Sequence, residues 1–227
     1  MTLVESAVLG VVQGLTEFLP VSSSAHLILA REFFGWRPET SQPGFDLAFD
    51  VFCHVGTLVA VLAFFRTDVL ALAGAVPAAV RGERSPAVRR LGLIAVGTVP
   101  VAIVVLLWGD ALEAVRTPAV AAVALLLGAA LLLLIERLGA QGDGEERLGW
   151  PGAFVIGVAQ AAALIPGVSR SGATIAAGMA FGLRRADAAR FTFLMSVPAI
   201  AAAAAKESLE LRTMTIGTDG LGVLVVG

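Results

Sequence analysis

Two short polar stretches interrupt the apolar sequence of this chain, and they restrict its possible folds more than any other feature. Residues 13–26 and 166–174 each begin in an apolar run of helical character, break it at a proline and gather hydroxyl side chains around the break. The arms on either side are shorter than the roughly 20 residues that a membrane-spanning helix needs. We therefore expect residues 2–35 and 150–183 to form two re-entrant helical hairpins.

The two stretches also correspond to each other. Sliding the second back by 147 positions aligns, without a gap, Gly10 with Gly157, Gln13 with Gln160, Val21 with Val168, Ser22 with Ser169, and Ser24 with Ser171. Interrupted hydrophobic segments at corresponding positions in two halves indicate a midplane binding site in inverted-repeat membrane proteins. We expect one membrane domain over residues 1–227, with an inverted repeat of about 1–137 and 150–227. The last apolar run, 216–227, is too short to cross a membrane, so the final span is expected to be truncated.

Composition places the whole chain in a membrane. Of its 227 residues, 57% are hydrophobic and only 15% are charged, and the mean hydropathy is +0.87, too apolar for an ordinary soluble domain. We expect an all-α, multi-pass protein of the cell membrane with about five to six transmembrane helices. The net charge of −2 offers no basic surface for nucleic acid, and the single Cys53 cannot form an internal disulfide.

Arginines give the expected orientation. The segment 81–90 carries four arginines against one glutamate, and the positive-inside rule predicts that it is cytoplasmic. The exit of the second hairpin is also basic, with Arg184, Arg185 and Arg190, whereas the charge of residues 31–44 after the first hairpin is balanced. The two hairpins are therefore expected to enter the membrane from opposite faces.

Glu17 and Arg170 are charged residues close to the two breaks, one in each hairpin. A charge at the centre of a membrane helix costs roughly 2.5 to 3.5 kcal/mol on insertion scales, so it needs a partner or a use. Arg170 is either an anion clamp, because a guanidinium fork matches phosphate oxygens, or a structural partner for Glu17. Glu17 is either a ligand for a hard divalent cation or only a counter-ion.

Hydroxyl side chains and a histidine flank the two breaks. The hydroxyl residues are Ser22, Ser23, Ser24, Ser169, Ser171 and Thr174. Each could simply cap a helix or allow close packing. If Ser22 or Ser23, and Ser169, cap the second arms, two helix N-termini point at one pocket and favour an anion there. His26, one turn further on, is a candidate general acid, base or nucleophile, or a buried hydrogen-bonding imidazole.

Other polar residues in apolar segments have simpler interpretations. Asp50 and His54, four positions apart near the start of a predicted span over 45–65, most simply form a local hydrogen bond. Gln13 and Gln160 either hold unpaired backbone groups at the breaks, or one of them faces a metal.

The interrupted stretches carry two long motifs. The first is Gln13-x-x-x-Glu17 with the following Phe-Leu-Pro-Val-Ser-Ser-Ser-Ala-His26, and the second is Pro166-Gly-Val-Ser-Arg-Ser-Gly-Ala-Thr174. They closely resemble the two signatures of the undecaprenyl-diphosphate phosphatase family, also called the bacitracin-resistance family, and the resemblance covers essentially the whole chain. Ala25 stands where the family often has Gly, and Ser24 where Thr is common; these are small changes that leave the chemistry intact.

This resemblance implies a metal-dependent membrane enzyme that removes the terminal phosphate from undecaprenyl diphosphate, a C55 lipid, and regenerates the carrier for cell-wall synthesis. It implies catalytic roles for Glu17, Ser23, His26 and Arg170, substrate binding by Ser22, Ser169, Arg170, Ser171 and Thr174, and metal binding by Gln13 and Glu17. The implied cofactor is a divalent cation, Mg²⁺ with Ca²⁺ as the alternative.

A transporter or flippase of polyprenyl phosphate lipids is the competing interpretation, because inverted hairpins with midplane polar residues also build secondary transporters. Glu17, His26 and the serine cluster favour an enzyme over a transporter, since translocation alone needs no acid–base pair. The sequence does not decide whether Ser23, His26 or a metal-bound water attacks the phosphorus. The oligomeric state is open as well, a homodimer included.

Overall fold

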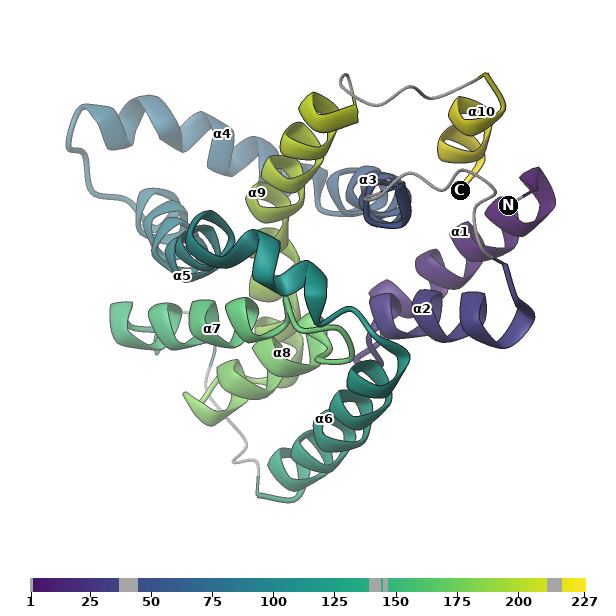
Figure 1. The fold of residues 1–227 in the computed structure, drawn as a ribbon. Helices are drawn as coiled ribbons and strands as arrows, with labels where there is room; N and C mark the ends of the chain where they lie inside the picture. The colour runs from purple at the N-terminus through teal and green to yellow at the C-terminus, as the bar shows by residue number, and fades with distance from the viewer. Residues whose placement is uncertain (1, 37–44, 139–143, 145–146, 212–217) are drawn as a thin grey trace.

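α-Helices dominate the part of the chain that the computed structural model describes, residues 2–36, 45–138, 144, 147–211 and 218–227 (Figure 1). The helices are α1 (Leu3–Glu17), α2 (Ser23–Phe34), α3 (Phe45–Phe64), α4 (Arg66–Val80), α5 (Pro86–Ala114), α6 (Pro118–Leu138), α7 (Trp150–Ala162), α8 (Arg170–Ala180), α9 (Arg185–Leu211) and α10 (Thr218–Val226).

Four of the described helices, α3, α5, α6 and α9, are long and apolar enough to cross a membrane. The 15 residues of α4 and the nine of α10 rise only about 22 and 14 Å, which is less than the roughly 30 Å of a hydrocarbon core. The described part thus holds four candidate spans, where the sequence predicted about five to six. The prediction of an all-α integral membrane protein is confirmed.

Two hairpins of short helices, α1 with α2 and α7 with α8, meet at their tips (Figure 1). Their helices have 15 and 12 residues in the first hairpin, and 13 and 11 in the second. Arg170 pairs with Glu17 across the tips, and the Ser171 hydroxyl donates to the Leu19 carbonyl oxygen at 3.0 Å. Entry of the hairpins into a bilayer from opposite faces stays a prediction, as does the division into repeats 1–137 and 150–227.

Unusual backbone conformations form both tips. Gly167, directly after Pro166, has φ of +99°, and a Cβ there would lie 2.3 Å from the Ala121 carbonyl oxygen of α6. The turn can approach α6 this closely only because it lacks a side chain. At the other tip, Ser22 has φ of +62° without being a glycine. Such strained conformations persist where the surroundings hold them, and they concentrate at functional sites.

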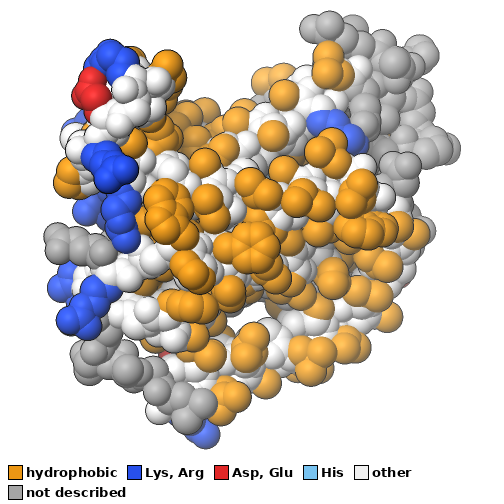
Figure 2. Space-filling model, turned by 90° about the vertical axis from the view of Figure 1, so that its left-hand side faces the viewer, with side chains coloured by type: hydrophobic (Ala, Val, Ile, Leu, Met, Phe, Trp, Pro, Cys, Tyr) orange, Lys and Arg blue, Asp and Glu red, His pale blue; other side chains and the backbone are white. Residues whose placement is uncertain are grey.

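Arginines gather along one edge of the molecule, beside a broad apolar surface (Figure 2). Arg185 of α9 pairs with Glu136 of α6, and Arg89 of α5 donates to the Leu148 carbonyl oxygen, just before α7, at 2.5 Å. These contacts bring the ends of four helices to the same edge. The positive-inside rule predicts that this edge faces the cytoplasm.

Small residues let two of the central helices come close together. A Cβ on Gly157 of α7 would lie 2.3 Å from the Gly97 carbonyl oxygen of α5. Contacts of this kind, with backbone against backbone, are typical of helix packing within membranes. They bring the second hairpin firmly against α5, which fixes the position of its tip.

Asp68, at the start of α4, connects three helices near the arginine-rich edge. Its carboxylate accepts hydrogen bonds from Arg90 of α5 at 2.8 Å and from Arg190 of α9 at 2.7 and 2.8 Å. Burial opposes ionisation of Asp68, but the hydrogen bonds from the two guanidinium groups outweigh it, so the pKa of Asp68 is lowered. One carboxylate thereby stabilises the packing of α4 against both spans.

The variant Asp68→Asn is expected to lower the free energy of unfolding by about 1 to 3 kcal/mol, because hydrogen bonds to charged groups are lost. A lowered pKa means that this contribution is complete above the ordinary value of 3.8 and is lost as the pH falls through the folded-state value. The difference in melting temperature between wild type and variant, measured in detergent, should be constant from about pH 5.5 to 7.5 and shrink in acid.

Asp187→Asn is the matched control, since Asp187 pairs with the exposed Arg184 three residues away and should contribute little. Equal effects of the two substitutions, or a difference that does not depend on pH, would contradict the role of Asp68.

Candidate active site

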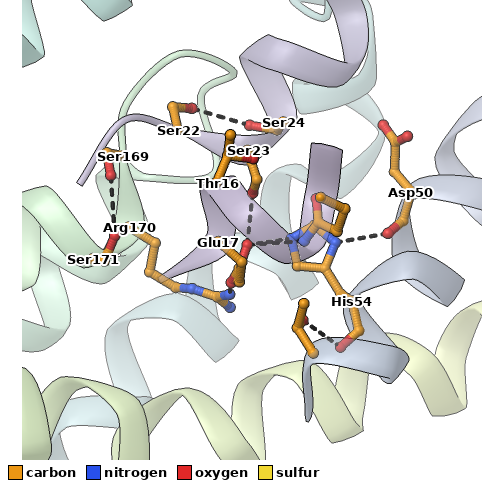
Figure 3. A network of polar contacts seen from close by, with 12 residues as sticks. Thr16, Glu17, Ser22, Ser23, Ser24, Asp50, His54, Ser169, Arg170 and Ser171 are labelled. Carbon is orange, nitrogen blue, oxygen red and sulfur yellow. Dashed lines mark hydrogen bonds and ion pairs between the residues drawn. The ribbon is translucent and has the colours of Figure 1, made fainter. Parts of the chain in front are cut away.

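A cavity of about 210 Å³ lies where the hairpin tips meet, and polar side chains from four parts of the chain line it. Figure 3 shows the polar side chains that the two hairpins and α3 contribute. Eight residues singled out from sequence lie in its wall: Glu17, Ser22, Ser23, Ser24, Gln160, Ser169, Arg170 and Ser171. His54 of α3 and Arg116 of the link between α5 and α6 join them. The two interrupted stretches therefore form one site, as the sequence predicted.

The Glu17 carboxylate is the centre of this site (Figure 3). Its Oε1 pairs with Arg170 from the second hairpin. Its Oε2 accepts hydrogen bonds from the Ser23 hydroxyl at 2.6 Å and from Gln13 Nε2 at 2.9 Å, and lies 3.3 Å from His54 Nε2. Because it contacts both hairpins and α3, Glu17 couples the geometry of the whole site.

The serines at the start of α8 form a compact cap. Ser169 is the N-cap residue, and its side chain accepts a hydrogen bond from the Gly172 N–H at 3.1 Å. The hydroxyl of Ser171 lies 3.2 Å from that of Ser169 and also holds the Leu19 carbonyl of the first hairpin. The predicted cap by Ser169 is confirmed, and the helix N-terminus faces the cavity through it.

The start of α2 differs. Ser22 occupies the N-cap position, but its side chain makes no cap hydrogen bond and instead lies 3.3 Å from the Ser24 hydroxyl. The first N–H groups of α2 are therefore not capped by Ser22, which leaves this helix end suited to an anion.

Three of the predicted site residues lie outside the cavity wall. His26 Nδ1 is 2.8 Å from the Ser22 carbonyl oxygen, and no hydrogen bond joins His26 to Ser23 in the described part. Thr174 is fully buried one turn behind Arg170, and its hydroxyl donates to the Arg170 carbonyl at 2.6 Å. Gln13 is fully buried behind Glu17, and its Oε1 has no hydrogen-bond partner among the described residues.

His54 is the site residue that sequence reasoning placed elsewhere. Its predicted local hydrogen bond is confirmed, because Nδ1 lies 2.7 Å from the Asp50 carbonyl oxygen. A carbonyl only accepts, so Nδ1 carries a hydrogen and the other ring nitrogen, Nε2, faces Glu17. Nε2 lies 3.3 Å from Glu17 Oε2, so a proton carried by either group would form a hydrogen bond between them.

Arg116 was not predicted from sequence at all. It pairs with Asp50, which is almost fully buried and is also held by Arg31 of α2 at 2.6 Å. The buried Asp50 and Arg31, together with the partly buried Arg116, connect α2, α3 and the α5–α6 link at the cavity. Arg116 lies in a short polar link without a motif, so only the folded structure reveals its place.

Gln160 corresponds to Gln13 in the other hairpin, but it lacks a carboxylate partner because Leu164 stands where the first hairpin has Glu17. It is 2% exposed and lines the active-site cavity, and neither its amide nitrogen nor its amide oxygen has a hydrogen-bond partner among the described residues. An unpaired buried polar group costs about 1 to 3 kcal/mol. Gln160→Leu should therefore keep or raise the melting temperature in detergent.

Gln13→Leu is the matched control and should lower the melting temperature, because it removes the hydrogen bond from Gln13 Nε2 to Glu17. A strong destabilisation by Gln160→Leu would mean that the amide of Gln160 is satisfied by a bound group.

The sequence of this chain matches one protein family and several relatives that share one name. The family model described as bacitracin resistance protein BacA matches residues 6–227. A protein named undecaprenyl-diphosphatase from Rubrobacter xylanophilus is 47% identical over 100% of this chain and 84% of its own length. Proteins of the same name from Alcanivorax borkumensis and Idiomarina loihiensis are 44% and 43% identical, over 97% and 100% of this chain and 83% and 84% of their own lengths. The chain belongs to the bacitracin resistance protein BacA family.

Proposed function

We propose that this chain hydrolyses undecaprenyl diphosphate to undecaprenyl phosphate and inorganic phosphate, and so recycles the lipid carrier for cell-wall synthesis. The observation that carries the proposal is the Glu17 carboxylate, which contacts Arg170, Ser23 and His54 where the hairpin tips meet. A guanidinium, a hydroxyl and an acid–base pair in one cavity are the groups that phosphoryl transfer uses. Relatives at 43 to 47% identity that are named undecaprenyl-diphosphatase support the substrate.

Phosphate binding falls to Arg170 and the helix starts beside it. The guanidinium pairs with Glu17 in the structure, and a bidentate phosphate is the ligand best able to compete for it. The N-termini of α2 and α8 add partial positive charge at the same place. Ser22, Ser169 and Ser171 line the cavity within reach of such a ligand. The apolar tail would lie between the helices, outside the polar cavity.

Ser23 is the hydroxyl best placed to attack. It donates its hydrogen bond to Glu17 at 2.6 Å, so the carboxylate is in position to accept the serine proton as the oxygen bonds to phosphorus. The bond to the departing undecaprenyl phosphate breaks as the new bond forms. Water then releases inorganic phosphate from the serine, and the hydroxyl regains its proton. A water held by Ser23 and Glu17 is the alternative attacking group.

The site also fits the expected divalent cation. Gln13 Oε1 is a buried acceptor without a partner in the described part, and it lies on the residue that contacts Glu17. The described residues contain no group of three or more His, Cys, Asp and Glu side chains that could hold a metal. Mg²⁺ needs no such cage, because it is commonly held by one or two protein oxygens, substrate phosphates and water. Bound by Gln13 and Glu17, the cation would neutralise charge on the phosphate oxygens.

The membrane location and the oligomeric state bear on this function as well. The four candidate spans and the family support a multi-pass membrane protein, and from the carrier lipid of the proposed reaction we infer that it acts in the plasma membrane. The described side chains of the proposed site, from both hairpins, α3 and the α5–α6 link, all belong to one chain. Homodimer formation, which the sequence allows, would leave this chemistry unchanged.

Release of inorganic phosphate from undecaprenyl diphosphate by the purified chain in detergent tests the function. Arg170→Lys is expected to lower kcat about 100-fold or more, because lysine keeps the charge but not the planar fork. Arg185→Lys, at the exposed pair with Glu136, is the matched control and should be unaffected.

Near-normal turnover in Arg170→Lys would remove the clamp role. Absence of phosphate release by the wild type, together with movement of the lipid across vesicle membranes, would instead favour the transporter interpretation.

His54 is expected to act as a positioning residue for Glu17. His54→Leu leaves the carboxylate without this partner and should lower kcat roughly 10- to 100-fold. His54→Gln can still donate a hydrogen bond to Glu17 and should restore most of that loss. If glutamine is as poor as leucine and both flatten the pH–rate profile, His54 transfers a proton itself. His26→Gln in the same assay tests the catalytic role that the family resemblance implies for His26. That role requires His26→Gln to lower kcat as much as Ser23→Ala does.

A further inference from the structure

A second and larger cavity, of about 950 Å³, lies at the arginine-rich edge, where the N-terminal ends of α5 and α7 meet. Among the residues that line it are Arg84, Ser85, Val88, Arg89, Leu93 and Trp150, and we call it the rim pocket. Its described lining shares no residue with the active-site cavity. On α5, Leu93 in the rim pocket and Val101 in the active-site cavity are eight residues, or about 12 Å, apart.

The rim pocket carries positive charge that the protein does not neutralise. Arg84 makes no hydrogen bond or ion pair in the described part of the chain. Arg89 donates one hydrogen bond to the Leu148 carbonyl, which is a neutral acceptor. No acidic side chain is among the described residues that line the pocket, and Asp68 nearby is already shared by Arg90 and Arg190. Two guanidinium groups are therefore available to an anion.

The walls of the rim pocket are apolar. Trp150 is half-exposed, and a Cβ on Gly92 would lie 2.8 Å from its ring, so the indole lies against α5. Val88 and Leu93 continue this apolar wall along α5. Figure 2 shows that the arginines of this edge border the broad apolar surface of the molecule. Tryptophan and arginine at such a border are typical of the membrane–water interface.

We propose that the rim pocket binds the phosphate of an anionic phospholipid from the surrounding leaflet. Arg84 and Arg89 hold the phosphate, and the N-terminal end of α5, capped by Ser85, adds favourable partial charge. The acyl chains pass Val88, Leu93 and Trp150 toward the apolar surface. A basic pocket between helices with an apolar wall fits a lipid headgroup better than a soluble anion, which gains nothing from that wall. This site is independent of the hydrolysis proposed above.

Lipid titration followed by native mass spectrometry tests this proposal on the purified protein in neutral detergent. Phosphatidylglycerol is compared with phosphatidylcholine of the same acyl chains, and the wild type is expected to bind the anionic lipid more tightly. One arginine near a membrane surface contributes about 1 kcal/mol, so Arg84→Gln should weaken phosphatidylglycerol binding roughly fivefold. Arg84→Gln with Arg89→Gln should weaken it roughly 30-fold, while phosphatidylcholine binding stays unchanged.

Arg81→Gln is the matched control. It removes the same charge from the same connection, but Arg81 is paired with Glu83 at 2.5 Å and does not line the pocket. Equal losses in Arg81→Gln and Arg84→Gln would show diffuse attraction and overturn the site, as would unchanged binding in the double variant. Full displacement of the lipid by an equal concentration of free glycerol phosphate would overturn the lipid identity. Arg84 is exposed and makes no hydrogen bond or ion pair in the described part, so its variant is expected to test the pocket without disturbing the fold.

Discussion

The ion pair between Glu17 and Arg170 is the interaction on which the site depends. It joins two residues 153 positions apart, one at each hairpin tip, and each alone would carry a large desolvation penalty inside a membrane. Paired, they neutralise each other while Glu17 also holds Ser23, Gln13 and His54. A buried pair with these additional hydrogen bonds can repay its desolvation, whereas removing one partner leaves an uncompensated charge. The same contact therefore stabilises the tips and assembles the reactive groups.

Interrupted helices bring these groups together, but they also leave backbone N–H and C=O groups at the helix ends that need hydrogen-bond partners. A helix that ends inside a membrane leaves N–H and C=O groups without partners. The Ser169 side chain accepts a hydrogen bond from an N–H at the start of α8, and the Ser171 hydroxyl donates one to the Leu19 carbonyl at the tip of the first hairpin. The start of α2 lacks a side-chain cap from Ser22. The N–H groups that Ser22 leaves uncapped by its side chain are suited to an anionic ligand.

The sequence was enough to predict the helical class, the two interruptions and the meeting of Glu17, Arg170 and the serines, because proline breaks and isolated membrane charges are local signals. It was not enough to choose between the two histidines. Both His26 and His54 lie four residues beyond the carbonyl that they contact, Ser22 for one and Asp50 for the other. Only the packing of α3 against the first hairpin shows that His54 also faces Glu17. Arg116 likewise lies at the site only through a tertiary contact, its ion pair with Asp50 of α3.

The resting contact between Arg170 and Glu17 also bears on when the site becomes reactive. Glu17 has a guanidinium on one oxygen and three further contacts on the other, so both of its oxygens are occupied in the structure as it stands. A phosphate that draws Arg170 away would release one oxygen for the proposed divalent cation, while the other oxygen keeps its hydrogen bond from Ser23. Phosphate binding, metal binding and the alignment of the serine would then depend on one exchange of partners. The residue that would bind the phosphate is the residue that occupies the carboxylate until the phosphate arrives.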